Sequence, residues 1–77
     1  MSESPIFTNH ALEKMKIWQL SEKTVLDAFN FGKVEKANFG GQWNAVKKYP
    51  GYEIGVNFDK KPDGRYVIVS VWLREKR

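Results

Sequence analysis

The chain has 77 residues with a formal net charge of +4, and 14% of its residues are aromatic. This length allows one domain, residues 1–77, whose small core must be dense in large side chains. The absence of cysteine excludes a disulfide scaffold, a Cys-ligated zinc site and a thiol nucleophile. No apolar run approaches the roughly 20 residues that span a bilayer, and the N-terminus lacks the pattern of a signal peptide. We therefore expect one cytoplasmic domain with no cofactor, no bound metal and no membrane contact.

The charge is divided unevenly along the chain. Residues 1–32 carry three lysines against four acidic residues, a net charge of −1, whereas residues 33–77 carry ten basic against five acidic residues, a net charge of +5. A basic half of this kind favours a polyanion or an acidic protein as partner. An ordinary solubilising surface has the same excess, so the charge alone does not choose between the two readings.

The first third of the chain has helical periodicity. Residues 1–4 are polar and are predicted to be loose, and Pro5–Thr8 predicts either a short edge strand or a lead-in. A first helix is predicted over residues 9–17, because its apolar positions form one stripe and Thr8 or Asn9 offers a side-chain oxygen as N-cap.

A second helix is predicted over residues 22–31. Ser21 is its candidate N-cap, and Glu22 in the first turn suits the positive end of the helix dipole. Gly32 is predicted as a left-handed residue that ends this helix.

After Gly32 the apolar period changes from 3.6 to 2, which predicts strands. The predicted strands and turns are, in chain order, strand 33–38, turn 39–41, strand 42–49, turn 50–51, strand 52–59, loop 60–64 and strand 66–73, with 74–77 fraying. Helices followed by strands indicate an α+β fold, with two N-terminal helices packed on one face of a three- to four-stranded antiparallel sheet. The other face is then left for solvent, a partner or chemistry.

Side-chain alternation predicts which residues line that open face. On the last strand they are Tyr66, Ile68, Ser70, Trp72 and Arg74, and on the preceding strand they are Glu53, Gly55, Asn57 and Asp59. On strand 42–49 the assignment stays open, but either Lys47 or Lys48 joins them. Aromatic rings beside basic side chains are typical of surfaces that bind single-stranded nucleic acid. The alternative is that the rings of Tyr66 and Trp72 pack on each other or on a terminal segment and simply cover the sheet.

His10 is the single histidine of the chain. At a helix N-terminus the dipole disfavours the charged imidazole, which leaves a neutral side chain able to accept a proton. The alternative is a helix-start histidine that bonds the backbone or packs near Met15. No second histidine or carboxylate cluster stands at ligand spacing, so a metal role is not predicted.

Four short motifs resemble those of a known family, and they are His10–Met15, Leu20–Val25, Val46–Tyr49 and Val67–Trp72. In kind and order they are similar to motifs of a small bacterial domain-of-unknown-function family related to the RelE/ParE toxin superfamily. The resemblance covers about residues 6–74 and implies a short first strand, two helices and a curved antiparallel sheet. One departure is Lys14, where the family commonly has arginine.

Proteins of that superfamily are toxins of toxin–antitoxin pairs, of which several cut messenger RNA on the ribosome and others block DNA gyrase. For this chain the resemblance implies catalytic roles for His10 and Arg74, in proton transfer and charge stabilisation. The nucleic-acid-binding residues that it implies are Lys47, Lys48, Arg65, Tyr66 and Trp72. An antitoxin protein and RNA or the ribosome are the implied partners.

The leading hypothesis from the sequence is therefore a toxin-like, metal-independent ribonuclease. The alternative is a non-catalytic module that binds a protein or a nucleic acid with the same basic sheet face. No particular oligomeric state is predicted.

Overall fold

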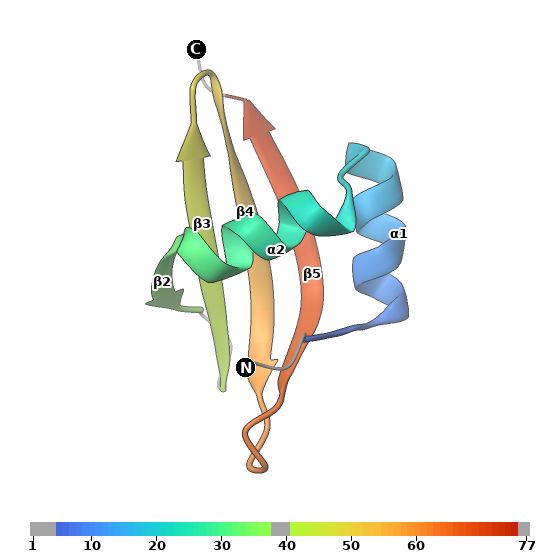
Figure 1. The fold of residues 1–77 in the computed structure, drawn as a ribbon, viewed down its shortest axis with the longest axis vertical. Coiled ribbons are helices and arrows are strands. Elements are labelled where there is room, and N and C mark those ends of the chain that lie inside the picture. The colour runs from blue at the N-terminus through green and yellow to red at the C-terminus, as the bar shows by residue number, and fades with distance from the viewer. Residues whose placement is uncertain (1–4, 38–40, 76–77) are drawn as a thin grey trace.

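The computed structural model describes residues 5–37 and 41–75, which form two helices and one sheet of five strands (Figure 1). The elements are β1 (Ile6–Phe7), α1 (Asn9–Trp18), α2 (Glu22–Phe31), β2 (Lys33–Lys36), β3 (Gln42–Tyr49), β4 (Tyr52–Lys60) and β5 (Tyr66–Glu75). The two helices precede the four longer strands, as the sequence predicts. The predictions made for residues 1–4, 38–40 and 76–77 lie outside the described residues.

The prediction of an antiparallel sheet with three or four strands is wrong, because the sheet is mixed. Its strand order is β1-β5-β4-β3-β2, and β1 runs parallel to β5 while the other neighbours are antiparallel. The parallel pair places Ile6 opposite Val67 and Phe7 opposite Ile68. Strand β1 has only two residues, which is too short to show an alternating apolar pattern, and its partner β5 lies near the other end of the chain. The sequence pattern therefore allowed a short strand at Pro5–Thr8 but gave no sign of its pairing.

Helix α1 begins and ends on local signals. The backbone N–H of Ala11 donates to the Thr8 hydroxyl at 3.1 Å, which makes Thr8 the N-cap. Gln19 ends the helix in the left-handed conformation at φ 56°. The predicted helix 9–17 is confirmed to within one residue.

Helix α2 has the predicted bounds and the predicted N-cap. The N–H of Thr24 donates to the Ser21 hydroxyl at 3.1 Å. The predicted left-handed Gly32 is wrong, because its backbone is extended with φ −75° and leads directly into β2. Crowding explains the glycine instead: a Cβ at this position would lie 2.5 Å from the carbonyl oxygen of Ala28.

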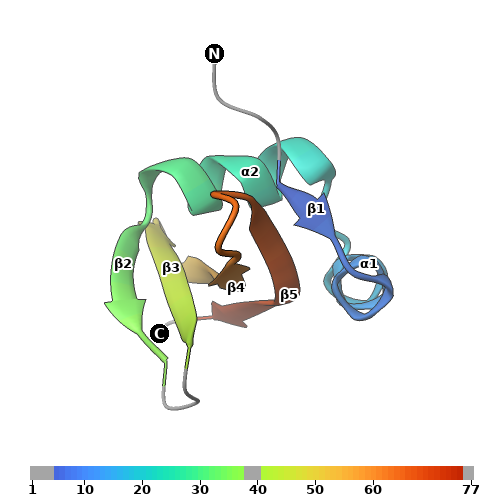
Figure 2. The same ribbon diagram turned by 90° about the horizontal axis from the view of Figure 1, so that it is seen from below.

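The two helices do not share one face of the sheet. Helix α2 crosses one face over β3 and β4, whereas α1 packs against β5 at the side of the sheet (Figures 1 and 2). We call the face under α2 the helix face, and its central row is Ala45, Val56 and Val71, which are at most 1% exposed. We call the opposite side the outer face, and no described helix crosses it (Figure 2).

A β-bulge in β5 decides which residues reach the outer face. Asn57 lies opposite Ser70, but the next residue of β4, Phe58, lies opposite Ile68, so Val69 is an extra residue. The hydroxyl of Thr8 lies 3.0 and 3.1 Å from the carbonyl oxygens of Ile68 and Val69 and so anchors the start of α1 to the bulge.

The bulge overturns part of the predicted open face. For the residues of β5 that precede Val69, the side chains point to the face opposite to the predicted one. Ile68 and Tyr66 therefore lie on the helix face beside Phe58 and Lys60. Tyr66 makes edge-to-face contacts with Phe29 of α2 and with Phe58, at ring-centroid distances of 5.5 and 5.7 Å. Its ring therefore covers the lower end of the core.

The strands β4 and β5 extend beyond their predicted ends. Strand β4 continues to Lys60, and β5 continues to Glu75, so residues 74 and 75 do not fray. Arg74 lies opposite Glu53, and Glu75 lies opposite Tyr52. This extension fixes the backbone of Arg74 on the sheet.

Candidate nucleic-acid interface

A row of charged residues crosses the outer face. Lys48 of β3 lies opposite Glu53 of β4, which in turn lies opposite Arg74 of β5. Directly opposite side chains in an antiparallel pair have Cβ atoms roughly 4.5–5.5 Å apart. Lys48 and Arg74 are exposed, whereas Glu53 is only 8% exposed. A buried carboxylate therefore lies between two cations that reach solvent.

Trp72 occupies the next row of the outer face and lies directly on β4. Its partner in the register is Gly55, and a Cβ built on Gly55 would lie 2.1 Å from Cε2 and from Cζ2 of the indole. Because glycine leaves that space empty, the ring can rest against the strand. Trp72 is partly exposed, so it presents aromatic surface beside the charged row.

The third row of the outer face is polar. Asn44, Asn57 and Ser70 lie opposite one another on β3, β4 and β5. The side-chain amide of Asn57 donates to the side-chain oxygen of Asn44 at 2.9 Å. The outer face thus combines cations, an aromatic ring and neutral hydrogen-bonding groups.

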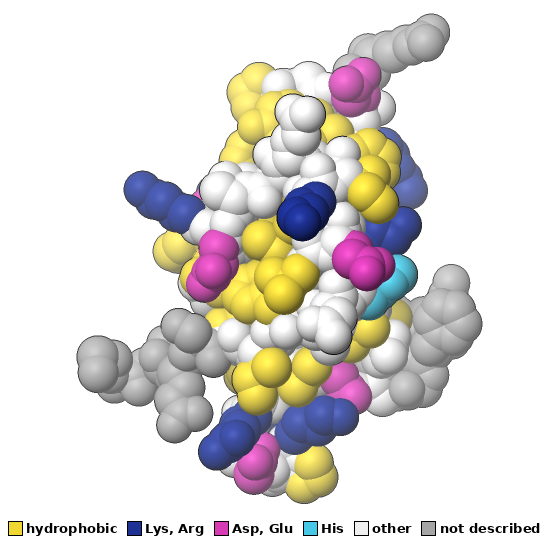
Figure 3. All heavy atoms as spheres, turned by 90° about the vertical axis from the view of Figure 1, so that its right-hand side faces the viewer, with side chains coloured by type: hydrophobic (Ala, Val, Ile, Leu, Met, Phe, Trp, Pro, Cys, Tyr) yellow, Lys and Arg dark blue, Asp and Glu magenta, His cyan; other side chains and the backbone are white. Residues whose placement is uncertain are grey.

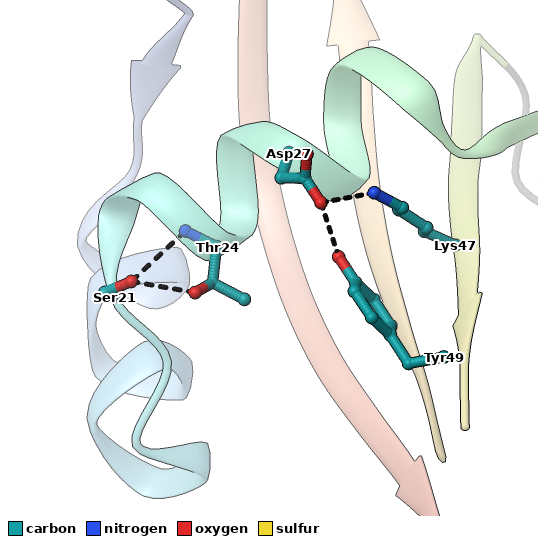
Figure 4. A network of polar contacts seen from close by, with 5 residues as sticks. All are labelled: Ser21, Thr24, Asp27, Lys47 and Tyr49. Atoms are coloured by element: carbon teal, nitrogen blue, oxygen red, sulfur yellow. Dashed lines mark hydrogen bonds and ion pairs between the residues drawn. The ribbon is translucent and has the colours of Figure 1, made fainter. Parts of the chain in front are cut away.

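Lys47 lies on the helix face, where α2 supplies its partner. Its ammonium group and the Tyr49 hydroxyl both donate to Oδ2 of Asp27, at 2.5 and 2.7 Å (Figure 4). The hydrogen bonds from Lys47 and from Tyr49 hold the pKa of Asp27 below its usual value of 3.8. Burial and the bond to Asp27 raise the pKa of Tyr49 to about 12. Lys47 is therefore paired within the fold, whereas its neighbour Lys48 lies on the other face and is exposed.

Two further predicted residues lie away from the outer face. Tyr66 belongs to the aromatic cluster on the helix face, with the ammonium of Lys60 5.8 Å from its ring centroid. Arg65 lies in the loop between β4 and β5, where its Nε is 3.5 Å from a carboxylate oxygen of Asp63. Both groups of that ion pair are mostly exposed.

His10 is exposed in the first turn of α1. The start of α1 is held at Ile68 by Thr8, and Arg74 lies six residues further along β5. At about 3.3 Å per residue this separation is about 20 Å. The structure does not bring His10 and Arg74 together.

Of the seven predicted site residues, the outer face brings together Lys48, Trp72 and Arg74. Sequence reasoning placed Glu53 and Gly55 on this face but gave neither a role. A signal for Gly55 existed, because a glycine inside a strand pattern often marks close approach of another group. The buried state of Glu53 had no such signal.

Exposed apolar side chains also occur on two other parts of the molecule. One part carries Ile6 on β1 with Leu12, Ile17 and Trp18 on α1, and the other carries Phe31, Val34 and Trp43 near β2. Figure 3 views the α1 side and shows hydrophobic side chains separated by charged ones. The α1 side is therefore a mixed surface rather than one continuous apolar patch.

Within the described part of the chain, no cluster of three or more His, Cys, Asp or Glu side chains is placed to hold a metal ion. Neither of the described helices is long and apolar enough to cross a membrane. Comparison of the chain with protein-family models, with curated proteins and with solved structures finds no match. The resemblance to the RelE/ParE superfamily thus stays a prediction from the sequence motifs.

Proposed function

We propose that the protein binds single-stranded RNA on its outer face, as the toxin-like member of a bacterial toxin–antitoxin pair in the cytoplasm. The observation that carries the proposal is that Trp72, which rests on Gly55, shares the outer face with two cations of the next row, Lys48 and Arg74. An antitoxin protein is the partner that such a pair requires.

The chemistry of the outer face suits an unpaired nucleic acid strand. A base stacks on an aromatic ring regardless of its identity, and each such contact contributes about 1–3 kcal/mol. Phosphates beside the base would meet Lys48 and Arg74, whose side chains are exposed. The amides of Asn44 and Asn57 offer hydrogen bonds to sugars and base edges.

The helix face supports this function less well. Its lysine nearest the centre, Lys47, is paired with Asp27, and its ring Tyr66 is packed between Phe29 and Phe58. A ligand that used Lys47 or Tyr66 would have to break these contacts, whereas Lys48, Trp72 and Arg74 of the outer face reach solvent.

The test is fluorescence anisotropy with a labelled single-stranded RNA of about ten nucleotides, within the usual site size of such surfaces. Trp72→Leu keeps an apolar cover over Gly55 but removes the ring, and we expect at least about tenfold weaker binding. Lys48→Gln and Arg74→Gln should each weaken binding and lower the salt dependence, by about 0.7 in the slope of log K against log salt.

Lys60→Gln is the matched control, because it removes the same charge from the helix face. It should leave the affinity within about twofold of the parent, since a distant exposed charge contributes little through salt-screened solvent. Equal losses from Lys60→Gln and Lys48→Gln would show binding by net charge alone and would refute the outer-face site.

RNA cleavage is the second candidate function, favoured by the position of Glu53 between Lys48 and Arg74. In such a reaction Glu53 would take the proton of a ribose 2′-hydroxyl, whose oxygen attacks the phosphorus. The 5′-oxygen leaves with a proton from water, and a 2′,3′-cyclic phosphate remains. The two cations would stabilise the charge that develops on the phosphate.

The cleavage test is a search for 2′,3′-cyclic phosphate ends on labelled RNA, together with growth of cells that express the protein alone. Glu53→Gln should abolish cleavage and growth arrest while RNA binding persists. Intact RNA and normal growth with the parent protein would eliminate cleavage and leave the binding function standing.

A further inference from the structure

The outer edge of β2 is a free strand edge that carries both apolar and charged side chains. Strand β2 is the last strand of the sheet, and all four of its residues are exposed. Within residues 5–37 and 41–75, nothing pairs with its second edge. Figure 2 shows β2 at the outside of the fold, with the C-terminal end of α2 stopping at this edge. Another strand can therefore approach it.

The backbone groups at this edge follow from the pairing of β2 with β3. The N–H of Ala37 donates to the carbonyl oxygen of Gln42 at 3.0 Å, so this is a hydrogen-bonded pair. In an antiparallel ladder hydrogen-bonded pairs alternate with non-bonded ones. The pairs that Val34 and Lys36 make with β3 are therefore the non-bonded ones. The N–H and C=O groups of these two residues point toward the free edge.

The side chains of the edge differ between the two faces of the sheet. On the helix-face side Val34 is 51% exposed and Trp43 is 36% exposed. Val34 and Trp43 line one groove of about 290 Å³. On the outer-face side the edge carries Lys33 and Glu35, which have opposite charges and stand two residues apart.

We propose that this edge pairs with β2 of a second copy of the chain, antiparallel, about a twofold axis that passes through Val34. In this register Val34 lies opposite Val34 of the second copy, where both can exchange N–H···O=C bonds. Lys33 of each copy lies opposite Glu35 of the other, so the dimer contains two opposite-charge pairs on the outer face. The apolar side chains meet on the helix-face side.

The charge pattern selects this register and this partner. Twofold registers centred on Lys33, Glu35 or Lys36 would each place two identical charges directly opposite one another, which is destabilising. A twofold interface uses the same patch on both copies, so the patch must complement itself. β2 does so only when Val34 is at the centre.

The short length of β2 limits the affinity of the dimer. Lysines on edge strands normally prevent pairing between sheets, but here each Lys33 meets a carboxylate of the other copy. Four residues and a few apolar side chains bury less than a standard interface of roughly 1,600 Å². We therefore expect a weak dimer that forms as the protein concentration rises.

The first test is sedimentation velocity between about 10 µM and about 1 mM, the range in which weak dimers form. The parent protein should shift toward twice its mass of 9.0 kDa. Val34→Lys should remain monomeric, because it places two lysines opposite each other at the axis. Ile6→Lys, at a position that is also half exposed on β1, should dimerise like the parent. A parent protein that stays monomeric throughout refutes the proposal.

The second test reverses the charges. Lys33→Glu and Glu35→Lys should each weaken the dimer by about tenfold or more, because each turns two attractions into two repulsions. The double variant Lys33→Glu/Glu35→Lys exchanges the signs and should recover the parent affinity to within about threefold. Circular dichroism melting of each variant checks that the fold is kept.

Mixing the two single variants gives the sharpest outcome. One variant carries two glutamates at the facing positions and the other two lysines, so the mixed pair is complementary although neither pairs with itself. Native mass spectrometry with one variant ¹⁵N-labelled should show mainly mixed dimers. Mixed and self-paired dimers in statistical proportion would overturn the Val34 register.

Discussion

The two faces of the sheet bury the middle of β4 in different ways. On the helix face, α2 covers the row Ala45, Val56 and Val71, and aliphatic packing excludes water. No described helix crosses the outer face, yet Gly55 and Glu53 in its centre are buried. There the Trp72 ring rests on the strand and gives cover that a helix gives on the other side.

Because of this difference, we assign the stability of the fold mainly to the helix face and ligand binding mainly to the outer face. A helix packs many side chains against the sheet, so the helix face holds the fold. A single ring covers the strand beneath it and still offers surface to solvent. We therefore expect changes on the helix face to lower the free energy of unfolding, and changes on the outer face to alter binding first.

The largest expected effect is the loss of a core side chain from the helix face. Ile54 is 1% exposed, and Ile54→Ala should lower the free energy of unfolding by about 2–5 kcal/mol because it leaves a cavity. Lys48→Ala on the outer face should cost less than about 0.5 kcal/mol. Urea denaturation followed by circular dichroism measures both, and similar losses would contradict the division between the faces.

Gly55→Ala adds a methyl group where the Trp72 ring lies directly on β4. The added Cβ collides with the indole of Trp72, so the ring must lift from β4. We expect a loss of about 1–3 kcal/mol in the free energy of unfolding, as for other overpacked sites. RNA affinity should fall in step with that of Trp72→Leu.

Lys60→Ala is the control for this substitution, since Lys60 is an exposed residue at the end of the same strand and on the other face, and it should change the free energy of unfolding by less than about 0.5 kcal/mol. If Gly55→Ala left both stability and tryptophan emission unchanged, the ring would not rest on β4 in solution.

The sequence predicted the helices well because their signals are local. The apolar stripe and the Ser21 cap are enough to place α2 to the residue. The pairing of β1 with β5 could not be predicted, because it depends on a contact between distant segments with no pattern of its own.

The candidate site was predicted in part, and the limit has a physical cause. Strict alternation along β5 placed Trp72 and Arg74 on the outer face correctly, because both follow the bulge. It misplaced Tyr66 and Ile68, because one extra residue at Val69 reverses every side chain before it. A bulge leaves no clear mark in a run of valine and isoleucine, so the error was inherent in the pattern.

The bulge itself gives the next prediction, because it determines which side chains reach each face. Thr8→Val keeps the shape of the side chain but removes the hydroxyl that caps α1 and contacts the carbonyl oxygens of Ile68 and Val69. We expect a loss of about 1–2 kcal/mol. Ser21→Ala, at the exposed cap of α2, should cost less. Hydrogen exchange should speed up around residues 66–70 only in Thr8→Val, and unchanged exchange there would argue against an anchoring role.

The smallest expected effect concerns the polar network that α2 makes with the helix face. Tyr49 has its pKa raised from 10.0 to about 12, chiefly by burial and then by its bond to Asp27. The folded protein therefore holds this proton more tightly than the unfolded chain. The resulting stabilisation is fully present below pH 10 and is lost as the pH rises from about 10 to about 12. Ultraviolet titration of tyrosinate should show one late step that is absent in Tyr49→Phe. In Asp27→Asn that step should move to lower pH but stay above 10, because burial remains.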